Sequence, residues 1–493
     1  PAAPSPFINH PLPHEIPEVK GAGRRAEQRE GEMWNTNMRA IPLAVVLLLW
    51  LVVAAAQGRK GADGGETGGE GEKHRKNVFL LREMRHVVKT DAGEMKVVRS
   101  HGGGMHADRS LFIGFIAMEP HSMFIPQYLD STLILFIHRG EAKIGCIRGN
   151  EMVETNLRAG DLYRIPAGSV FYLLNTNNEQ RLRIICSIDP SESLGFSSGF
   201  KSFFVGGGID PVSILEGFDQ RTLSAAFNVS IGELREVMSR QRKGPIVYTD
   251  RHPSMWSEFL KLKQQDRLDH MKRISGEGEG REERKPAWSW RRILRPFATE
   301  TNRMSKNTAE STEPFNIYDK EPDFKNDYGW STAVDQLDYP TLQESGVGMY
   351  LVNLTAGSMM VPHLNPTATE YGIILSGSGA LQVVFPDGTG TNAMIGQGDV
   401  FWVPKYFPFC QIASRDSSLE FIGFTTSSHR NRPRFLIGAD SILNQMRGPE
   451  MAAAFGVSEE RLRHIVTAQR EAVIVPSNYA APGDGVRRAA AAK

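Results

Sequence analysis

The sequence has few cysteines and no excess of charge of either sign. Its 493 residues include only three cysteines, Cys146, Cys186 and Cys410. Three scattered cysteines are too few for a disulfide framework or a CxxC metal cluster. Lysine and arginine total 57 against 56 aspartate and glutamate residues, a formal net charge of +1. Because nonspecific phosphate binding depends on a clear positive excess, we expect no nucleic-acid partner.

The sequence also lacks an apolar run of the length that crosses a membrane. Residues 41–56 read IPLAVVLLLWLVVAAA, which is shorter than the roughly 20 apolar residues that span a bilayer. Arg39 precedes this run and small residues end it, so residues 38–56 are predicted to be a cleaved secretory signal peptide. A membrane anchor is the alternative, which the short length and Pro42 disfavour. Residues 1–37 are interpreted as leader or gene-model artefact, and no membrane association is expected after cleavage.

Apolar residues and turn formers are abundant. Hydrophobic residues make up 40% of the chain, which also has 48 glycines and 28 prolines, as expected for a globular protein of many short strands. β-Branched and apolar runs, broken by glycine or by a Pro-Asp-Gly turn, occupy residues 131–149 and 368–390. Such runs are typical of β-hairpins, so the fold class is predicted to be dominated by β-structure.

Two pairs of segments repeat in the same order. Residues 160–175 (GDLYRIPAGSVFYLLN) match residues 398–413 (GDVFWVPKYFPFCQIA) in the Gly-Asp pair and a later proline. Residues 225–242 (AAFNVSIGELREVMSRQR) match residues 453–470 (AAFGVSEERLRHIVTAQR). Each half of the chain is therefore predicted to be a strand-rich domain followed by a short α-helical arm.

The helical arms have recognisable start signals. Ser230 and Ser458 stand where a helix N-cap belongs, and only the first has an acidic capping-box partner, Glu233. The first arm has apolar residues that we expect to need a partner surface: Leu223, Phe227, Val229, Leu234 and Val237.

These patterns divide the chain into segments. After the signal peptide we predict a disordered Gly/Glu-rich segment (57–76), a first domain with its arm (77–260), a charged linker (261–313), a second domain with its arm (314–476) and a disordered tail (477–493). The sequons that begin at Asn228 and Asn353 are candidates for glycosylation in the secretory pathway.

A metal-binding motif is partly present in the second half. Gly357, His363, Asn365, Glu370 and Gly377 have the spacing Gly-(x)5-His-x-Asn-(x)4-Glu-(x)6-Gly. This resembles the first motif of the cupins, with one histidine replaced by asparagine. The resemblance implies two jelly-roll β-barrels that can each enclose a small cavity.

The first half matches the second cupin motif. Gly160, Pro166, Gly168 and Asn175 have the expected spacing, and Phe171 stands in place of the histidine. We therefore expect no metal in the first half.

Two cupin domains in a secreted chain, each followed by a helical arm, resemble the vicilin-type 7S seed storage globulins of plants. The resemblance covers roughly residues 77–476, and stretches such as PHLNPTATE are closest to the vicilin-like branch. It implies a homotrimer in which each arm docks on the neighbouring subunit. It also implies a nutrient reservoir without enzymatic activity, which passes through the secretory pathway to the protein storage vacuole or the cell exterior.

A binding function in the second barrel is the alternative. His363 and Glu370 keep their motif positions, Phe409 stands at the late histidine position, and Cys410 follows it. Together His363, Glu370 and Cys410 are the candidate ligands for copper or zinc. The competing interpretation gives all three structural roles, as a hydrogen-bonded histidine, an ion-paired glutamate and a packed thiol.

A small apolar or anionic ligand in this barrel is a further possibility. Its candidate lining residues are Met360, His363, Tyr371, Phe401, Trp402 and Phe409. Because successive residues of a strand face opposite sides, Phe401 and Trp402 cannot both line the interior.

Overall fold

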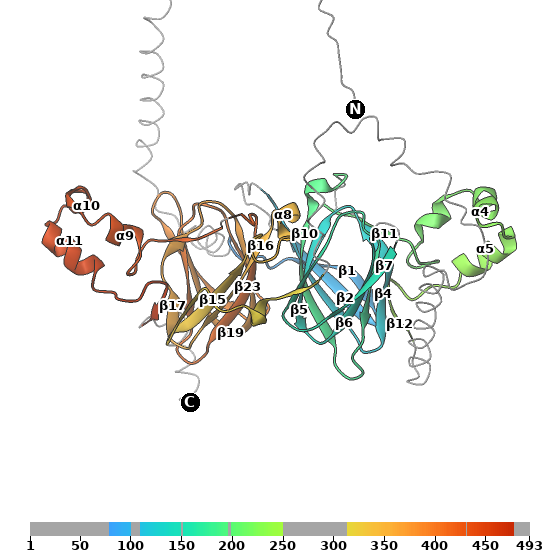
Figure 1. Ribbon diagram of the computed structural model, residues 1–493, viewed down its shortest axis with the longest axis horizontal. Coiled ribbons are helices and arrows are strands. Elements are labelled where there is room, and N and C mark those ends of the chain that lie inside the picture. Colours follow the sequence, from blue (N-terminus) through green and yellow to red (C-terminus); the bar gives the residue numbers. More distant parts are fainter. Residues whose placement is uncertain are drawn as a thin grey trace, which may run out of the picture. The chain divides into compact units, whose positions relative to one another are not determined.

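The computed structural model describes residues 78–99, 109–148, 151–195, 199–249, 313–429 and 431–477. The predicted leader, signal peptide, Gly/Glu-rich segment and C-terminal tail lie outside these residues, except for Ser477, and so does the linker, except for Glu313. The described chain forms two strand-rich barrels, one from each half of the repeat, and two helical arms (Figure 1). Among the described residues, no helix has the length and apolar character needed to cross a membrane.

Two antiparallel sheets form the first barrel. Its strands are β1 (Met84–Thr90), β2 (Gly93–Arg99), β3 (Phe112–Met118), β4 (Ser122–Leu129), β5 (Thr132–Arg139), β6 (Ala142–Arg148), β7 (Glu151–Leu157), β8 (Asp161–Ile165), β9 (Phe171–Asn175), β10 (Leu182–Asp189), β11 (Ser202–Phe204), β12 (Ile246–Tyr248) and β13 (Phe315–Asn316). One sheet has the order β1-β2-β3-β10-β5-β8-β13, and the other has the order β11-β4-β9-β6-β7 with β12 also paired to β4.

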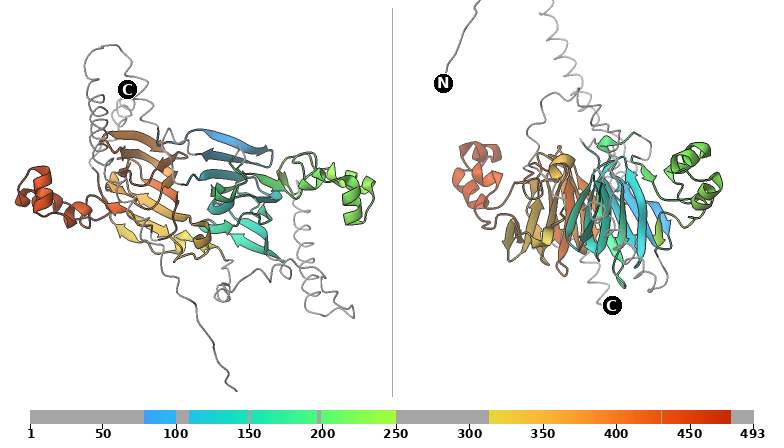
Figure 2. Two further views of the ribbon diagram at one scale, coloured as in Figure 1. Left: turned by 90° about the horizontal axis from the view of Figure 1, so that it is seen from above. Right: turned by 45° about the vertical axis from the view of Figure 1, so that its right-hand side comes forward.

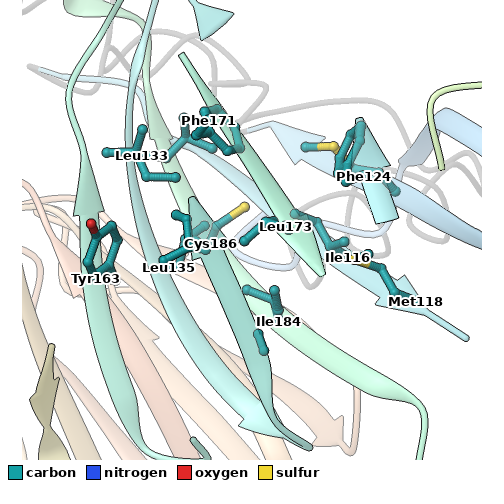
Figure 3. Packing of buried hydrophobic residues seen from close by; sticks show 14 of the residues in the cluster. Ile116, Met118, Phe124, Leu133, Leu135, Tyr163, Phe171, Leu173, Ile184 and Cys186 are labelled. Carbon is teal, nitrogen blue, oxygen red and sulfur yellow. The ribbon is translucent and has the colours of Figure 1, made fainter. Parts of the chain in front are cut away.

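The core of the first barrel lies between its two sheets. Figure 3 shows Leu135 of β5, Leu173 of β9 and Cys186 of β10 side by side in this core, where all three are fully buried. Burial raises the pKa of the Cys186 thiol to about 12, so this cysteine is an uncharged part of the packing.

The second barrel is built from one continuous set of strands. These are β14 (Phe324–Asn326), β15 (Gly329–Val334), β16 (Gly348–Leu354), β17 (Ser358–Met360), β18 (His363–Leu364), β19 (Glu370–Val384), β20 (Gly390–Gly396), β21 (Val400–Val403), β22 (Phe409–Ala413), β23 (Leu419–Thr425), β24 (Arg434–Phe435) and β25 (Ile474–Pro476). The main path through them is β14-β15-β16-β23-β19-β22-β17-β25.

The two predicted hairpins form strands but pair differently from the prediction. Residues 131–149 give β5 and β6, which belong to different sheets instead of pairing with each other. In the second barrel the equivalent stretch is the single long strand β19, which pairs with β21 and β23 in its first part and with β20 and β22 in its second. A register shift between Ile374 and Ser376 accompanies the change of partner. Of the two predicted hairpins, only the one in residues 368–390 is found, where the turn at Pro386-Asp387-Gly388 joins β19 to β20.

Each arm contains a pair of short helices joined by a tight turn (Figure 2). The first arm has α4 (Gln220–Phe227) and α5 (Ile231–Met238), and the second has α9 (Ile442–Gln445), α10 (Pro449–Phe455) and α11 (Glu459–Val466). Ser230 forms a reciprocal capping box with Glu233, whereas Ser458 caps α11 through its side chain alone. The predicted helix starts are therefore confirmed.

The two barrels share a second core and exchange short segments. The shared core joins residues such as Ile113 of β3 and Phe136 of β5 to Met349 of β16. Phe79 O accepts a 2.9 Å hydrogen bond from the backbone of Trp402 on β21, so the first described residues pair with the second barrel. In return, Phe315 of β13 pairs with Leu162 of β8 in the first barrel. We call residues 78–81 and 315–316 the exchanged segments.

Candidate functional site inside the second barrel

Successive side chains of β19 face two different environments, the barrel interior and the core shared with the first barrel. Ile374 packs in the barrel interior with Phe401 and Phe421, whereas Tyr371 and Ile373 belong to the core shared with the first barrel. Glu370 has the same parity as Ile374 before the register shift, so it lies on the interior face. The interior of the second barrel thus contains a carboxyl group.

The predicted lining residues divide along the same line. Met360, Phe401 and Phe409 are in the interior cluster, as predicted. Trp402 and Tyr371 are not, because they face the shared core. There the Trp402 Nε1–H donates to Val78 O at 3.0 Å, and the Tyr371 hydroxyl accepts a 3.3 Å hydrogen bond from Leu111 N.

Glu370 is buried beside two polar side chains. Its Oε1 accepts a 2.8 Å hydrogen bond from Asn365 Nδ2. The Tyr350 hydroxyl of β16 approaches the same carboxyl and lowers its pKa, although the two groups do not meet strict hydrogen-bond geometry. The Tyr350 ring passes over Gly423 of β23, where a Cβ atom would lie 2.1 Å from its Cζ. Burial raises the pKa of Glu370 to about 7, against the opposing effect of Asn365 and Tyr350.

Asn365, which replaces a cupin histidine, builds a turn. Its Oδ1 accepts hydrogen bonds from Thr367 N at 3.0 Å and Ala368 N at 2.9 Å. Its Nδ2 donates to Glu370 and, at 2.7 Å, to Asn431 Oδ1. Both amide hydrogens are thereby used, so this asparagine positions the loop that leads into β19.

His363 is a neutral imidazole between two aromatic rings. Its Nδ1 lies 2.7 Å from Val361 O, and since a carbonyl can only accept, Nδ1 carries the proton and Nε2 a lone pair. The ring centroid is 4.1 Å from that of Phe409 and 5.6 Å from that of Phe435. Burial lowers the pKa of His363 to about 4, so the ring stays uncharged at neutral pH.

Cys410 does not join His363. The partner of His363 across β18 and β22 is Phe409, so Cys410 points to the opposite face of the sheet. There its thiol lies 3.7 Å from Gln382 Oε1, and burial raises its pKa to about 12. Nowhere in the described ranges do three or more His, Cys, Asp or Glu side chains form a group that could hold a metal ion. The donor set His363, Glu370 and Cys410 therefore does not fit copper or zinc, which need about four convergent ligands.

Three polar residues escaped the motif-based analysis. Gln411 lies between the interior residues Phe409 and Ala413, and its Oε1 has no hydrogen-bond partner within the described structure. Tyr350 lies two residues before the interior residue Val352 on β16, so it shares its face and packs against the interior cluster. In the first barrel, Gln127 pairs with Phe171 and is 1% exposed, and neither amide atom has a partner among the described residues. Strand alternation around known interior residues is the signal that would have identified them.

The two-barrel fold defines the class of protein. The family model described as Cupin matches residues 79–230 and 315–463. The chain therefore belongs to the cupin family, as a two-barrel member.

Its relatives identify the branch. A vicilin-like seed storage protein of Arabidopsis thaliana is 50% identical over 422 residues, which are 83% of this chain and 82% of the relative. The crystal structure of hazelnut (Corylus avellana) vicilin superposes with a TM-score of 0.65 at 24% identity, over 82% of this chain and 100% of that chain. The crystal structure of Solanum melongena vicilin, described as having different anionic ligands in structurally similar pockets, has a TM-score of 0.66 at 17% identity, over 83% of this chain and 100% of that chain. The protein is a vicilin-type seed storage bicupin, a nutrient reservoir without enzymatic activity.

Proposed function

We propose that this storage protein is deposited in protein storage vacuoles as a homotrimer held together by its helical arms. The single observation that carries the assembly is an apolar surface that occurs in the same form on both arms. The compartment rests on the signal-like residues 38–56 and on the storage role of the relatives.

The two arms expose the same three positions. The exposed fractions are 51%, 38% and 68% in the first arm and 58%, 38% and 55% in the second, for Phe227, Val229 and Val237 and for Phe455, Val457 and Ile465 respectively. Leu223 and Leu234, which we predicted would also need a partner, are already buried, at 6% and 9% exposed. Exposed apolar side chains that recur at matching positions favour a docking surface.

Light scattering of the purified full chain tests the assembly. The wild-type mass should be three times the chain mass. Phe227→Asp combined with Val237→Asp should shift it towards one chain, because a buried carboxylate without a partner is costly. Met152→Asp is a matched control, since Met152 is 57% exposed on β7 and lies outside both arms. A wild-type monomer, or a trimer that the arm variant leaves intact, would refute arm-mediated assembly.

Seed fractionation tests the reservoir role. We expect the protein to accumulate in the protein storage vacuoles of maturing seed and to disappear by proteolysis during germination. Quantitative immunoblots of isolated vacuoles over both periods measure this. Scarcity in seed, or persistence in the seedling, would argue against storage.

A small molecule inside the second barrel is a second proposed role. Gln411 Oε1, which is buried and has no hydrogen-bond partner among the described residues, favours a hydrogen-bonding ligand, and Tyr350 packs against the same interior cluster. The interior contains the Glu370 carboxyl, whose negative charge repels an anion. An anionic ligand, as in the Solanum melongena vicilin, should therefore bind better below about pH 7, where Glu370 is protonated. Mass spectrometry of small molecules released from the wild-type protein and from Tyr350→Phe tests this. A stoichiometric molecule lost from the variant would support it, and an empty wild-type barrel would not.

Metal analysis decides the copper or zinc proposal for His363, Glu370 and Cys410. Because the three side chains do not converge, we expect no stoichiometric metal. About one ion per chain that disappears in His363→Ala would instead establish a real site.

A further inference from the structure

We propose that a cleft on the first barrel, separate from the cupin metal position, binds a small amphipathic anion: an acid with an apolar chain. The cleft lies between the β1–β2 hairpin, β11 and the residues that lead out of the first arm into β12, and its volume is about 730 Å3. We call it the β1/β12 cleft. Its lining contains neither Phe171, which stands at the late histidine position of the cupin motif, nor Gln127, which pairs with it.

The charge of the lining selects the sign of the ligand. Five cationic side chains surround the cleft, and they are Arg85, Lys89, Lys201, Arg242 and Lys243. Among the described residues, the carboxylates that line it are Asp91 and Asp210. Within the described structure no ion pair occupies Arg85, Lys89 or Lys243. On a chain whose net charge is only +1, this local excess of positive charge favours an anion.

The floor of the cleft selects an apolar chain. Phe124, Phe200 and Met95 line it and are themselves part of the first barrel's core, and Phe124 is among the core residues shown in Figure 3. Phe204 of β11 packs against the same core and stays partly exposed. A volume of this size with an apolar floor and a few charged groups is typical of sites for small molecules, which occupy roughly 300–1,000 Å3.

Hydrogen bonds hold the walls of the cleft in place. Thr90 Oγ1 donates to Ile246 O at 2.8 Å, and the Tyr248 hydroxyl donates to Asp91 O at 3.0 Å, so the end of β1 and the first residue of the β1–β2 turn are tied to β12. Gly244 N donates to Asp210 O at 3.1 Å, which ties the residues just before β12 to the segment that precedes the first arm. The cleft is thus formed before a ligand arrives, which lowers the entropic cost of binding.

Calorimetry with three probes tests the proposal on the full chain. Dodecanoate has the charge and the chain, dodecanol has only the chain, and inorganic phosphate has only the charge. We expect dodecanoate to bind with about one molecule per chain and at least about tenfold more tightly than either of the others. Equal binding of dodecanol, equal binding of phosphate, or no binding of dodecanoate would overturn the proposal.

Variants separate the two contributions. Reversing the charge with Arg242→Glu and Lys243→Glu should weaken dodecanoate binding about tenfold and leave dodecanol unchanged, because two exposed ion pairs contribute about that much. Phe204→Ala should weaken both. Arg432→Glu with Arg434→Glu, two exposed cations of the second half, is the control for net charge. Circular dichroism checks that each variant folds. A loss of dodecanoate affinity in the Arg432→Glu and Arg434→Glu control, with no loss in the cleft variants, would refute this location.

Discussion

Glu370 is the buried group whose charge changes near neutral pH. Its pKa is raised from 4.5 in the unfolded reference to about 7 in the folded barrel, mainly by burial. Between these two values the unfolded chain releases its proton before the folded chain does. The stabilising contribution is therefore fully present at acid pH and is lost as the pH rises towards 7.

This sign leads to a prediction for Glu370→Gln. The wild-type free energy of unfolding should fall by up to roughly 3 kcal/mol between pH 4.5 and pH 7.5, the size that a shift of this kind implies. The variant has no proton to lose and should show a smaller fall, which denaturant titrations at the two pH values measure. Glu233→Gln is the control, because capping by Ser230 lowers the pKa of that exposed carboxyl. Identical pH profiles for the wild type and Glu370→Gln would contradict the assignment.

Residue spacing predicted part of the site. The motif led to His363 and Glu370, and both side chains are buried in the second barrel. It failed for Cys410, since a one-residue difference in strand parity decides which face a side chain takes, and the sequence does not reveal the parity. Gln411, one position further on, is the residue that faces inward.

At the scale of elements, the turn between α4 and α5 restricts which residues can occupy it. Asn228 ends α4 in a left-handed conformation with φ of 54°, and Ser230 caps α5 two residues later. The second arm has Gly456 and Ser458 at the matching positions, with φ of 65° at the glycine. Asparagine and glycine are the residues that tolerate this conformation, so the Asn-Val-Ser sequon of the first arm is compatible with the capping requirement of its turn.

Removing the first cap should loosen α5 more than the matching change loosens α11. Ser230→Ala is expected to cost about 1 kcal/mol, because it removes the hydrogen bonds that Ser230 Oγ accepts from Glu233 N and donates to Glu233 Oε2. Ser458→Ala removes one hydrogen bond, which Ser458 Oγ accepts from Arg461 N, and should cost less. Hydrogen exchange of the α5 and α11 amides measures each effect. Equal loss of protection in the two arms would show that Glu233 contributes nothing.

The two sequons should differ in glycosylation if the chain is secreted as proposed. Asn228 is exposed on the turn of the arm. Asn353 is half-buried on β16, paired with Trp330 on one side and Glu420 on the other, where a glycan would obstruct the sheet. Glycopeptide mass spectrometry of secreted protein should find a glycan at Asn228 only. Asn228→Gly, which keeps the turn, should abolish it, and Asn353→Gln should change nothing; a glycan on Asn353 would contradict the structure.

At the scale of the whole molecule, the internal repeat predicted two barrels and two arms, whereas the contacts between the halves were not predictable. The domain boundaries at residues 77–260 and 314–476 place Phe79 and Phe315 in their own barrels. Each instead pairs with the other barrel. Both are aromatic residues in short apolar stretches that could pair with either sheet, so nothing local to the sequence distinguishes the two partners.

The exchanged segments have a consequence for how the reserve is broken down. After a single proteolytic cut between Thr249 and Phe315, each half still pairs with the other. Phe79 of the first half pairs with Trp402 of the second, and Phe315 of the second pairs with Leu162 of the first. The fragments should therefore migrate as one particle in native gel filtration and separate only in denaturant. Complete breakdown requires the two barrels to separate along their shared core. A single cleavage between them therefore leaves both halves folded and associated.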